Sequence, residues 1–150
     1  MWFEKIKSIA ELVALASSWG PTKTVMCQGT FDIVHIGHLR HLLYAKAEGD
    51  ILIVSLYTDS WLARHPCEKK LNQAQLQQLH VPQDQRTLAI AVIEAVDYVC
   101  PENEGSDNLL ALKPNVFAIG YDYIYKKVDI EPQKKIVESY GGKMLFTPQN

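Results

Sequence analysis

A strand, a turn and the start of a helix follow one another within residues 25–43, and this succession constrains the fold more than any other part of the chain. The apolar run at 25–27 predicts a buried strand, which the Gly-Thr pair at 29–30 brings to an end. Apolar residues recur at helical spacing from Leu39 onward, so we expect a helix that begins near His38. Unpaired backbone N–H groups and the positive end of a helix dipole meet at such a turn, which suits an anion such as phosphate.

Strands and helices alternate along the rest of the chain. The predicted strands cover residues 23–28, 51–56, 98–100, 115–119 and 144–146, and the predicted helices cover residues 3–17, 39–47, 82–96, 107–112 and 130–140. The uninterrupted apolar strand at 51–56 is typical of a parallel sheet with helices on both faces. We therefore expect an α/β fold, Rossmann-like and doubly wound, with a mainly parallel five-stranded sheet. In the helix over 82–96 we expect Leu88, Val92 and Ala95 to face the core.

Composition narrows the class of protein. The 150 residues carry a net charge of −2, with 47% hydrophobic and 21% charged residues, and this balance gives no argument for nucleic-acid or membrane partners. Three scattered cysteines without a C-x-x-C pair favour a reducing, cytoplasmic compartment over a disulfide framework or a zinc cage. The length and the absence of a linker or an internal repeat predict one domain.

Two histidines, His35 and His38, lie three residues apart with Gly37 between them. Neighbouring imidazoles can bind a metal ion, transfer protons or donate hydrogen bonds to phosphate oxygens. Zinc would need a third or fourth well-placed ligand, and His41, one helical turn further on, is weak support for one. Taken alone, the pair is better explained as polar residues at a solvent-facing helix start.

Gly29-Thr-Phe-Asp32 followed by His35-Ile-Gly-His38 resembles the signature of the cytidylyltransferase-like nucleotidyltransferase family. Its members include glycerol-phosphate cytidylyltransferase and the adenylyltransferase domain of ADP-heptose synthase, and the resemblance covers about residues 3–148. It implies the HxGH type of nucleotidyltransferase fold. It also implies that His35 and His38 are catalytic, contacting the triphosphate and stabilising the charge that builds as the α-phosphorus becomes five-coordinate.

The resemblance places the first turn against the nucleotide. Gly29 would allow close backbone approach, and Thr30 and Phe31 would point N–H groups at phosphate. A simple turn is the alternative for Gly29, and core packing is an equal alternative for Phe31. We expect a structural role for Asp32, because a carboxylate beside phosphates is repulsive unless a metal ion intervenes.

Further nucleotide contacts are implied later in the chain. Arg86 matches an arginine that the family places at the start of this helix, where it would bind phosphate or base. The alternative for Arg86 is a surface salt bridge with Asp84 or Glu94. Gly120 and Asp122 match a K-G-x-D-Y type element of the family, so we expect both near the nucleotide.

The polar, glutamine-rich segment over residues 64–82 is either a short helix or a mobile flap. Relatives carry lysines after the second strand, so Lys69 and Lys70 are the catalytic cations that the resemblance implies. Arg64 begins the same basic run. A solvated charged run is the alternative for each of these three residues.

The end of the second strand supplies candidates for the acceptor. Thr58 and Asp59 follow that strand directly, and ligands of open parallel sheets gather at the carboxyl ends of strands. We therefore predict that Thr58, Asp59 and Arg64 bind the acceptor. No metal ligand is predicted among the side chains of the chain itself.

The last residues depart from the family. The sequence stops at Thr147-Pro-Gln-Asn150, where relatives continue into a serine- and threonine-rich turn whose following helix holds the β- and γ-phosphates. We therefore expect residues 1–150 to form a single nucleotidyltransferase domain that is truncated at its C-terminal end. The resemblance also leaves room for a homodimer and for a sugar kinase, fused or as a partner.

The implied reaction transfers a nucleoside monophosphate from ATP or CTP to a phosphorylated sugar or polyol and releases pyrophosphate, with Mg²⁺ bridging the triphosphate. The N-terminal helix and residues 94–98 favour the ADP-heptose synthase branch, whereas the Gly29-Thr30 pair keeps a glycerol-phosphate-type cytidylyltransferase open. A non-catalytic nucleotide-binding domain is the alternative of another class. Ile119, where relatives often carry lysine, and the missing last turn favour it.

Overall fold

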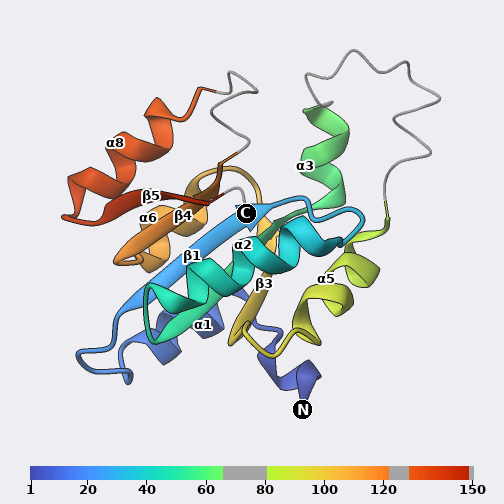
Figure 1. Ribbon diagram of the computed structural model, residues 1–150, viewed down its shortest axis with the longest axis horizontal. Coiled ribbons are helices and arrows are strands. Elements are labelled where there is room, and N and C mark those ends of the chain that lie inside the picture. Colours follow the sequence, from blue (N-terminus) through green and yellow to red (C-terminus); the bar gives the residue numbers. More distant parts are fainter. Residues whose placement is uncertain (66–80, 122–128, 149–150) are drawn as a thin grey trace.

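A computed structural model gives the three-dimensional structure and describes residues 1–65, 81–121 and 129–148. Five strands form one sheet in the order β3-β2-β1-β4-β5, and every strand pair in it is parallel. The strands are β1 (Thr24–Gly29), β2 (Ile51–Tyr57), β3 (Tyr98–Asn103), β4 (Val116–Gly120) and β5 (Lys143–Thr147). The helical elements are η1 (Trp2–Lys5), α1 (Ile9–Ala16), α2 (Ile36–Ala47), α3 (Asp59–Arg64), α5 (Gln83–Ala91), α6 (Asp107–Leu112) and α8 (Glu131–Ser139). Figure 1 shows their arrangement.

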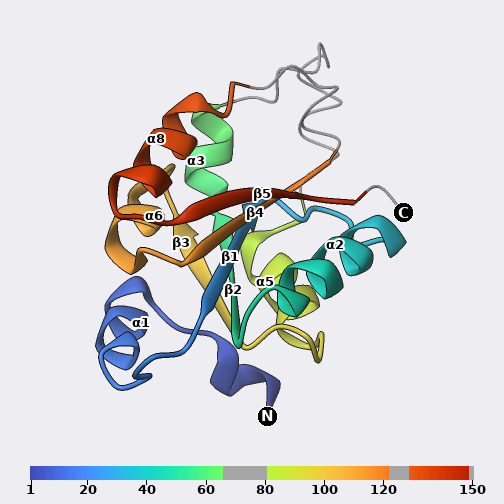
Figure 2. The ribbon, with the colours of Figure 1, turned by 60° about the vertical axis from the view of Figure 1, so that its left-hand side comes forward.

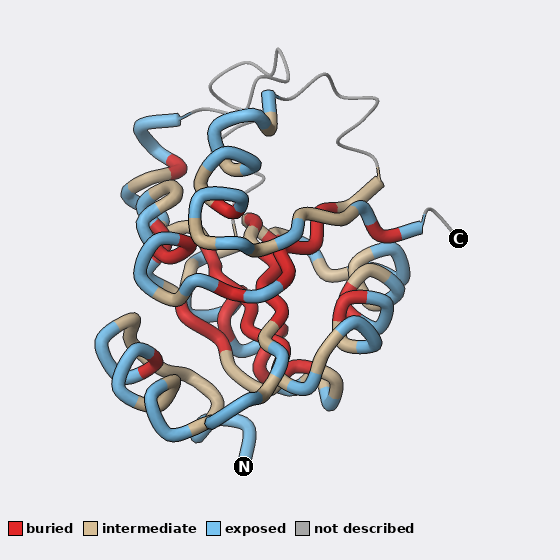
Figure 3. Tube along the Cα trace, turned by 90° about the vertical axis from the view of Figure 1, so that its left-hand side faces the viewer, coloured by how far each residue is buried: buried red, intermediate tan, exposed pale blue. Residues whose placement is uncertain are grey.

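Helices cover both faces of the sheet, as predicted for a doubly wound fold. Helices α2 and α5 cover one face, and α1, α6 and α8 cover the other (Figure 2). Their buried side chains accordingly belong to two separate core clusters. Strand β1 serves both layers, since Val25 and Cys27 point to the first and Met26 to the second. The central strands are accordingly buried along most of their length (Figure 3).

The strand order reverses at β1. The chain builds β2 and β3 on one side of β1 and then places β4 and β5 on the other. In open parallel sheets this reversal leaves a crevice beyond the carboxyl ends of the two strands, where ligands bind. Here those ends are Gly29 and Gly120, so the fold brings two of the predicted nucleotide-binding residues to the switch point.

The N-terminal part is not the single helix that was predicted over 3–17. The short 3-10 helix η1 ends at Lys5, and Ile6 then forms a parallel bridge with Val99 at the outer edge of β3. Helix α1 starts afresh after Ser8, whose Oγ accepts a hydrogen bond from the Glu11 N–H at 3.1 Å in a capping box. The apolar spacing was compatible with one helix, but the capping box and the pairing with β3 divide it.

The helix predicted over 82–96 is shorter and differently oriented. It ends at Ala91, and Leu88 and Val92, which were expected to face the core, are 42% and 56% exposed. The buried face instead includes Arg86 and Ile90. A buried arginine thus sets the rotation of α5, and hydrophobic spacing alone could not reveal this. Helix α3 was also not predicted.

No helix within the described ranges combines the length and the apolar composition that a membrane crossing requires.

The thiols of Cys27 and Cys100 are fully buried, and burial raises the pKa of both, that of Cys100 to about 11. The reactive thiolate is therefore scarce at neutral pH. In a Cys67→Ser variant, we expect iodoacetamide to leave the folded protein unmodified at pH 7.5 and to label two thiols once urea has unfolded it. Mass spectrometry measures the count, and rapid labelling of the folded protein would contradict this packing.

Candidate functional site

His35 and His38 form one unit at the start of α2. His35 is the N-cap residue of this helix, and its Nδ1 accepts a hydrogen bond from the Gly37 N–H at 3.0 Å. The His35 N–H in turn donates to Nδ1 of His38 at 3.4 Å. The two rings stack with centroids 4.0 Å apart and planes 23° apart. The predicted pair is thus brought together by the helix cap itself.

These hydrogen bonds determine which ring nitrogen carries the proton. A neutral imidazole has one N–H and one acceptor nitrogen, and in His35 and His38 the acceptor is Nδ1. The N–H of each neutral ring is therefore on Nε2. Both rings lie at the N-terminus of α2, where the positive end of the helix dipole favours an anionic ligand.

Two glycines make room for the rings of this turn. A Cβ at Gly37 would lie 2.8 Å from Cε1 of His35, and a Cβ at Gly29 would lie 3.1 Å from the ring of Phe31. The Phe31 ring is buried in the core and lies 5.1 Å from the His38 ring, centroid to centroid. Core packing of Phe31, one of its two predicted roles, is therefore confirmed.

The backbone of Phe31 adopts φ 50°, a left-handed conformation that is rare for a bulky residue. Such strain persists only where the surroundings impose it, and it often marks functional turns. Here Asp32, the next residue, accepts a hydrogen bond from the Val81 N–H at 2.6 Å. The structural role predicted for Asp32 is confirmed, since it ties the turn to the residues before α5.

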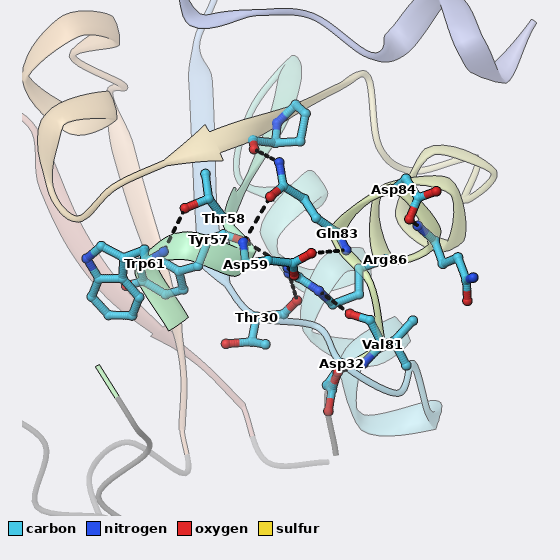
Figure 4. A network of polar contacts seen from close by, with 12 residues as sticks. Thr30, Asp32, Tyr57, Thr58, Asp59, Trp61, Val81, Gln83, Asp84 and Arg86 are labelled. Carbon is cyan, nitrogen blue, oxygen red and sulfur yellow. Dashed lines mark hydrogen bonds and ion pairs between the residues drawn. The ribbon is translucent and has the colours of Figure 1, made fainter. Parts of the chain in front are cut away.

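Arg86 lies at the centre of a polar network beneath the same turn (Figure 4). Its side chain is 0% exposed. The guanidinium donates from Nε to Val81 O at 2.8 Å, from Nη1 to Thr30 O at 2.9 Å, and from Nη2 to Tyr57 O at 3.0 Å and Asp59 Oδ1 at 2.8 Å. One buried residue thus joins the first turn, the end of β2 and the starts of α3 and α5.

The position of Arg86 decides between its two predicted roles only in part. A surface salt bridge with Asp84 or Glu94 is wrong, because the guanidinium is buried and pairs with Asp59. Direct contact with a nucleotide would require the guanidinium to leave these acceptors, and that role stays a prediction. Asp59 also accepts the Gln83 N–H at 3.0 Å, which makes it part of the network.

Two of the predicted acceptor-binding residues meet at an unpredicted carboxylate. Thr58 caps α3 by accepting the Trp61 N–H at 3.0 Å, and its hydroxyl donates to Glu104 at 2.5 Å. The guanidinium of Arg64 forms an ion pair with the same carboxylate. Glu104 follows β3, the strand beside β2, and only the sheet order reveals this neighbourhood.

Three aromatic rings stack along α3. Tyr57 and Trp61 have centroids 4.1 Å apart, and Trp61 and His65 have centroids 4.2 Å apart, with nearly parallel planes in both pairs. Sequence reasoning missed this stack. Its signal was the i, i+4 spacing of the three rings. Tyr57 ends β2, Trp61 lies in α3 and His65 is the C-cap of α3, so this spacing brings the rings to one side of the helix.

The other predicted residues are distributed as follows. Gly120 ends β4 and pairs with Thr147 of β5, whose hydroxyl lies 2.7 Å from Nδ1 of His41. The predictions for Lys69, Lys70 and Asp122, and for most of the segment over 64–82, lie outside the described residues.

A Gly37→Ala substitution tests the helix cap. Alanine favours a helix by about 1 kcal/mol over glycine, but losing the His35 cap costs a similar amount, so we expect little change in melting temperature. The new Cβ would displace the ring of His35, however, and we expect weaker binding of inorganic tripolyphosphate in calorimetry. Ile36→Ala, an exposed position in the same turn, is the control and should bind as the parent does. Unchanged binding by Gly37→Ala would contradict a role for the His35 ring.

Comparison with known proteins agrees with this geometry. The sequence profile of the family described as Cytidylyltransferase-like matches residues 26–145. Proteins named "Bifunctional protein HldE" are 34% identical over 93% of this chain in Campylobacter concisus and 36% identical over 92% in Aliarcobacter butzleri. In both cases the match spans 29% of the relative's length, so this chain corresponds to less than a third of those proteins.

Solved structures show the same fold. The lipopolysaccharide core biosynthesis protein from Thermoplasma volcanium superposes with a TM-score of 0.66 at 26% identity, covering 86% of this chain and 98% of that one. Pantoate-beta-alanine ligase from Francisella tularensis gives 0.63 at 18% identity, covering 95% of this chain and 66% of that one, and supports the fold alone. With the profile matching most of its length, the chain belongs to the cytidylyltransferase-like family of nucleotidyltransferases.

Proposed function

We propose that this domain transfers a nucleoside monophosphate from ATP or CTP to a phosphorylated sugar or polyol and releases pyrophosphate. The observation that carries the proposal is the stacked pair of His35 and His38 imidazoles at the N-terminus of α2, each with an Nδ1 that accepts a backbone N–H. They lie at the carboxyl end of β1, beside the switch point of a nucleotidyltransferase fold.

The proposed chemistry is a direct in-line displacement. A phosphate oxygen of the acceptor attacks the α-phosphorus, a new P–O bond forms, and the bond to the bridging oxygen of pyrophosphate breaks. Negative charge grows on the phosphoryl oxygens and on the leaving group, and fixed donors stabilise it without reorganisation. The Nε2–H groups of His35 and His38 are such donors, because the helix cap holds both rings in place. No covalent enzyme intermediate is required.

We further propose that Mg²⁺ enters with the triphosphate. The described residues contain no group of three or more His, Cys, Asp or Glu side chains arranged to hold a metal ion. In nucleotide sites Mg²⁺ is usually held by phosphate oxygens, water and one or two carboxylates. When bound, the ion would neutralise charge on the triphosphate.

Several observations favour an ADP-heptose synthase-like acceptor, a sugar phosphate. The relatives named HldE are 34% and 36% identical, and one of the similar solved structures is that of a lipopolysaccharide core biosynthesis protein. Because those relatives are called bifunctional and are more than three times longer, a kinase that supplies the sugar phosphate is a natural partner or fusion. The Gly29-Thr30 pair supports a glycerol-phosphate-type cytidylyltransferase as the second candidate.

Pyrophosphate release tests the function. Purified protein is incubated with Mg²⁺, ATP or CTP, and a panel of sugar and polyol phosphates. We expect turnover with one pair, and a loss of about 100-fold or more in kcat for His38→Ala, as for removal of one fixed donor in other enzymes. Lys134→Ala, an exposed change on α8, is the control. Nucleotide binding without turnover for any pair would instead favour a non-catalytic nucleotide-binding domain.

Glu104→Gln tests the acceptor side. Its carboxylate holds Arg64 and the Thr58 hydroxyl, the groups that we expect to bind the acceptor phosphate. Removing this competing charge should lower the KM for the sugar phosphate by about 2- to 5-fold, a modest effect because exposed ion pairs contribute about 0.2–1 kcal/mol. The KM for the nucleotide should not change.

Glu102→Gln is the matched control, since Glu102 lies two residues earlier, on β3, but accepts a hydrogen bond from Ile9 N–H at the start of α1. A higher KM for the sugar phosphate in Glu104→Gln would show that Glu104 binds the acceptor itself. That result would indicate that the carboxylate of Glu104 contacts hydroxyl groups of the acceptor and not its phosphate.

A further inference from the structure

The guanidinium of Arg86 is a buried positive charge directly below the first turn. It is 0% exposed, whereas its counter-ion Asp59 has a side chain that is 53% exposed. Water therefore screens the carboxylate more than the guanidinium. The nearest part of the turn is the Thr30 carbonyl, which accepts the Nη1–H at 2.9 Å. The charge thus acts on the peptide between Thr30 and Phe31.

Peptide geometry then fixes a second group. No cis peptide bond occurs in the described residues, so the peptide that joins Thr30 and Phe31 is trans. In a trans peptide the C=O and N–H groups point in opposite directions. Because the Thr30 C=O points at the guanidinium of Arg86, the Phe31 N–H points away from it, out of the buried network.

The same hydrogen bond strengthens this N–H as a donor. A guanidinium bonded to a peptide carbonyl draws electron density through the amide, and hydrogen bonds in series polarise one another. The left-handed backbone of Phe31, with φ 50°, keeps the amide in a conformation that the residue would not adopt alone. The Phe31 ring, in turn, lies beside the His38 ring.

We propose that Arg86 is a positioning residue: it aims and polarises the Phe31 N–H as a third donor, beside the imidazoles of His35 and His38, for the phosphate that undergoes transfer. This inference rests on the proposed function and deepens it. Arg86 acts without touching the substrate, and its contribution passes through the Thr30–Phe31 peptide.

A purely structural Arg86 would behave differently. Its bonds to Val81 O, Tyr57 O and Asp59 stabilise the junction of three elements whether or not the Phe31 amide binds a ligand. Such a role predicts a lower melting temperature for a variant, with no change in the amide's response to nucleotide. The test must therefore observe the Phe31 amide itself.

The first measurement uses the unaltered protein and needs no turnover. In a ¹⁵N–¹H spectrum, addition of MgATP without an acceptor should move the Phe31 amide proton downfield, as expected for a new bond to phosphate. The amide of Ala45, buried in α2, should not move. An unmoved Phe31 amide in a protein that binds MgATP overturns the proposal.

The second measurement uses Arg86→Lys, which keeps a positive charge but cannot bond all four acceptors. We expect a smaller Phe31 response and a loss of about 10-fold or more in kcat, with little change in the KM for the nucleotide. The control is Asn108→Ala, which removes a buried side chain bonded to Ser55 on the opposite face of the sheet. It should lower the melting temperature yet leave kcat and the Phe31 response unchanged.

The outcomes separate this inference from the proposed function. If the unaltered protein shows the Phe31 response but no pyrophosphate release, the donor is supported and nucleotidyl transfer is not. If it shows turnover but Arg86→Lys keeps the full Phe31 response and the full kcat, the positioning role is overturned and the function stands. If Arg86→Lys does not fold, the response in the unaltered protein still decides whether the amide is a donor.

Discussion

The hydrogen bond from the Gly37 N–H to Nδ1 of His35 is the contact on which the site depends. It caps α2 and also fixes the ring nitrogen of His35 that carries the proton. Formation of the helix therefore also positions this N–H donor. A serine or an aspartate would cap the helix well, but neither would place an N–H donor at the positive end of its dipole. The glycine in H-x-G-H follows from the same contact, because any Cβ there would meet the imidazole.

The hydrogen-bond network of Arg86 holds this helix cap in position relative to the sheet. A buried charge is costly unless it is paired and hydrogen-bonded. Arg86 meets this condition only when the first turn, the end of β2 and the residues before α5 all lie within reach of its guanidinium. Its burial therefore specifies the spacing of these elements, and it also explains why α5 turns Leu88 toward solvent.

The sequence predicted the structure correctly where a local residue pattern is compatible with only one type of element. The apolar strands, the start of α2 and the parallel, doubly wound architecture follow from patterns within about 30 residues, as for a βαβ unit. The predictions for the helices over 3–17 and 82–96 were wrong because hydrophobic spacing reveals neither the capping box at Ser8 nor the burial of Arg86. Glu104 was missed for another reason: its contact with Arg64 spans 40 residues of chain, and only the order of β2 and β3 brings them together.

Arg86 also shows why residue type does not fix a role. An arginine at the start of a helix near a phosphate site suggests direct contact, and its pairing with Asp59, 27 residues away, is invisible in the sequence. Yet burial does not remove its charge from the chemistry. In a region of low dielectric, a guanidinium strongly polarises a peptide whose carbonyl it bonds. In the Thr30–Phe31 peptide, the Phe31 N–H points away from the guanidinium. An arginine whose residue type suggests direct phosphate contact can thus act on the phosphate indirectly, through the peptide group that it bonds.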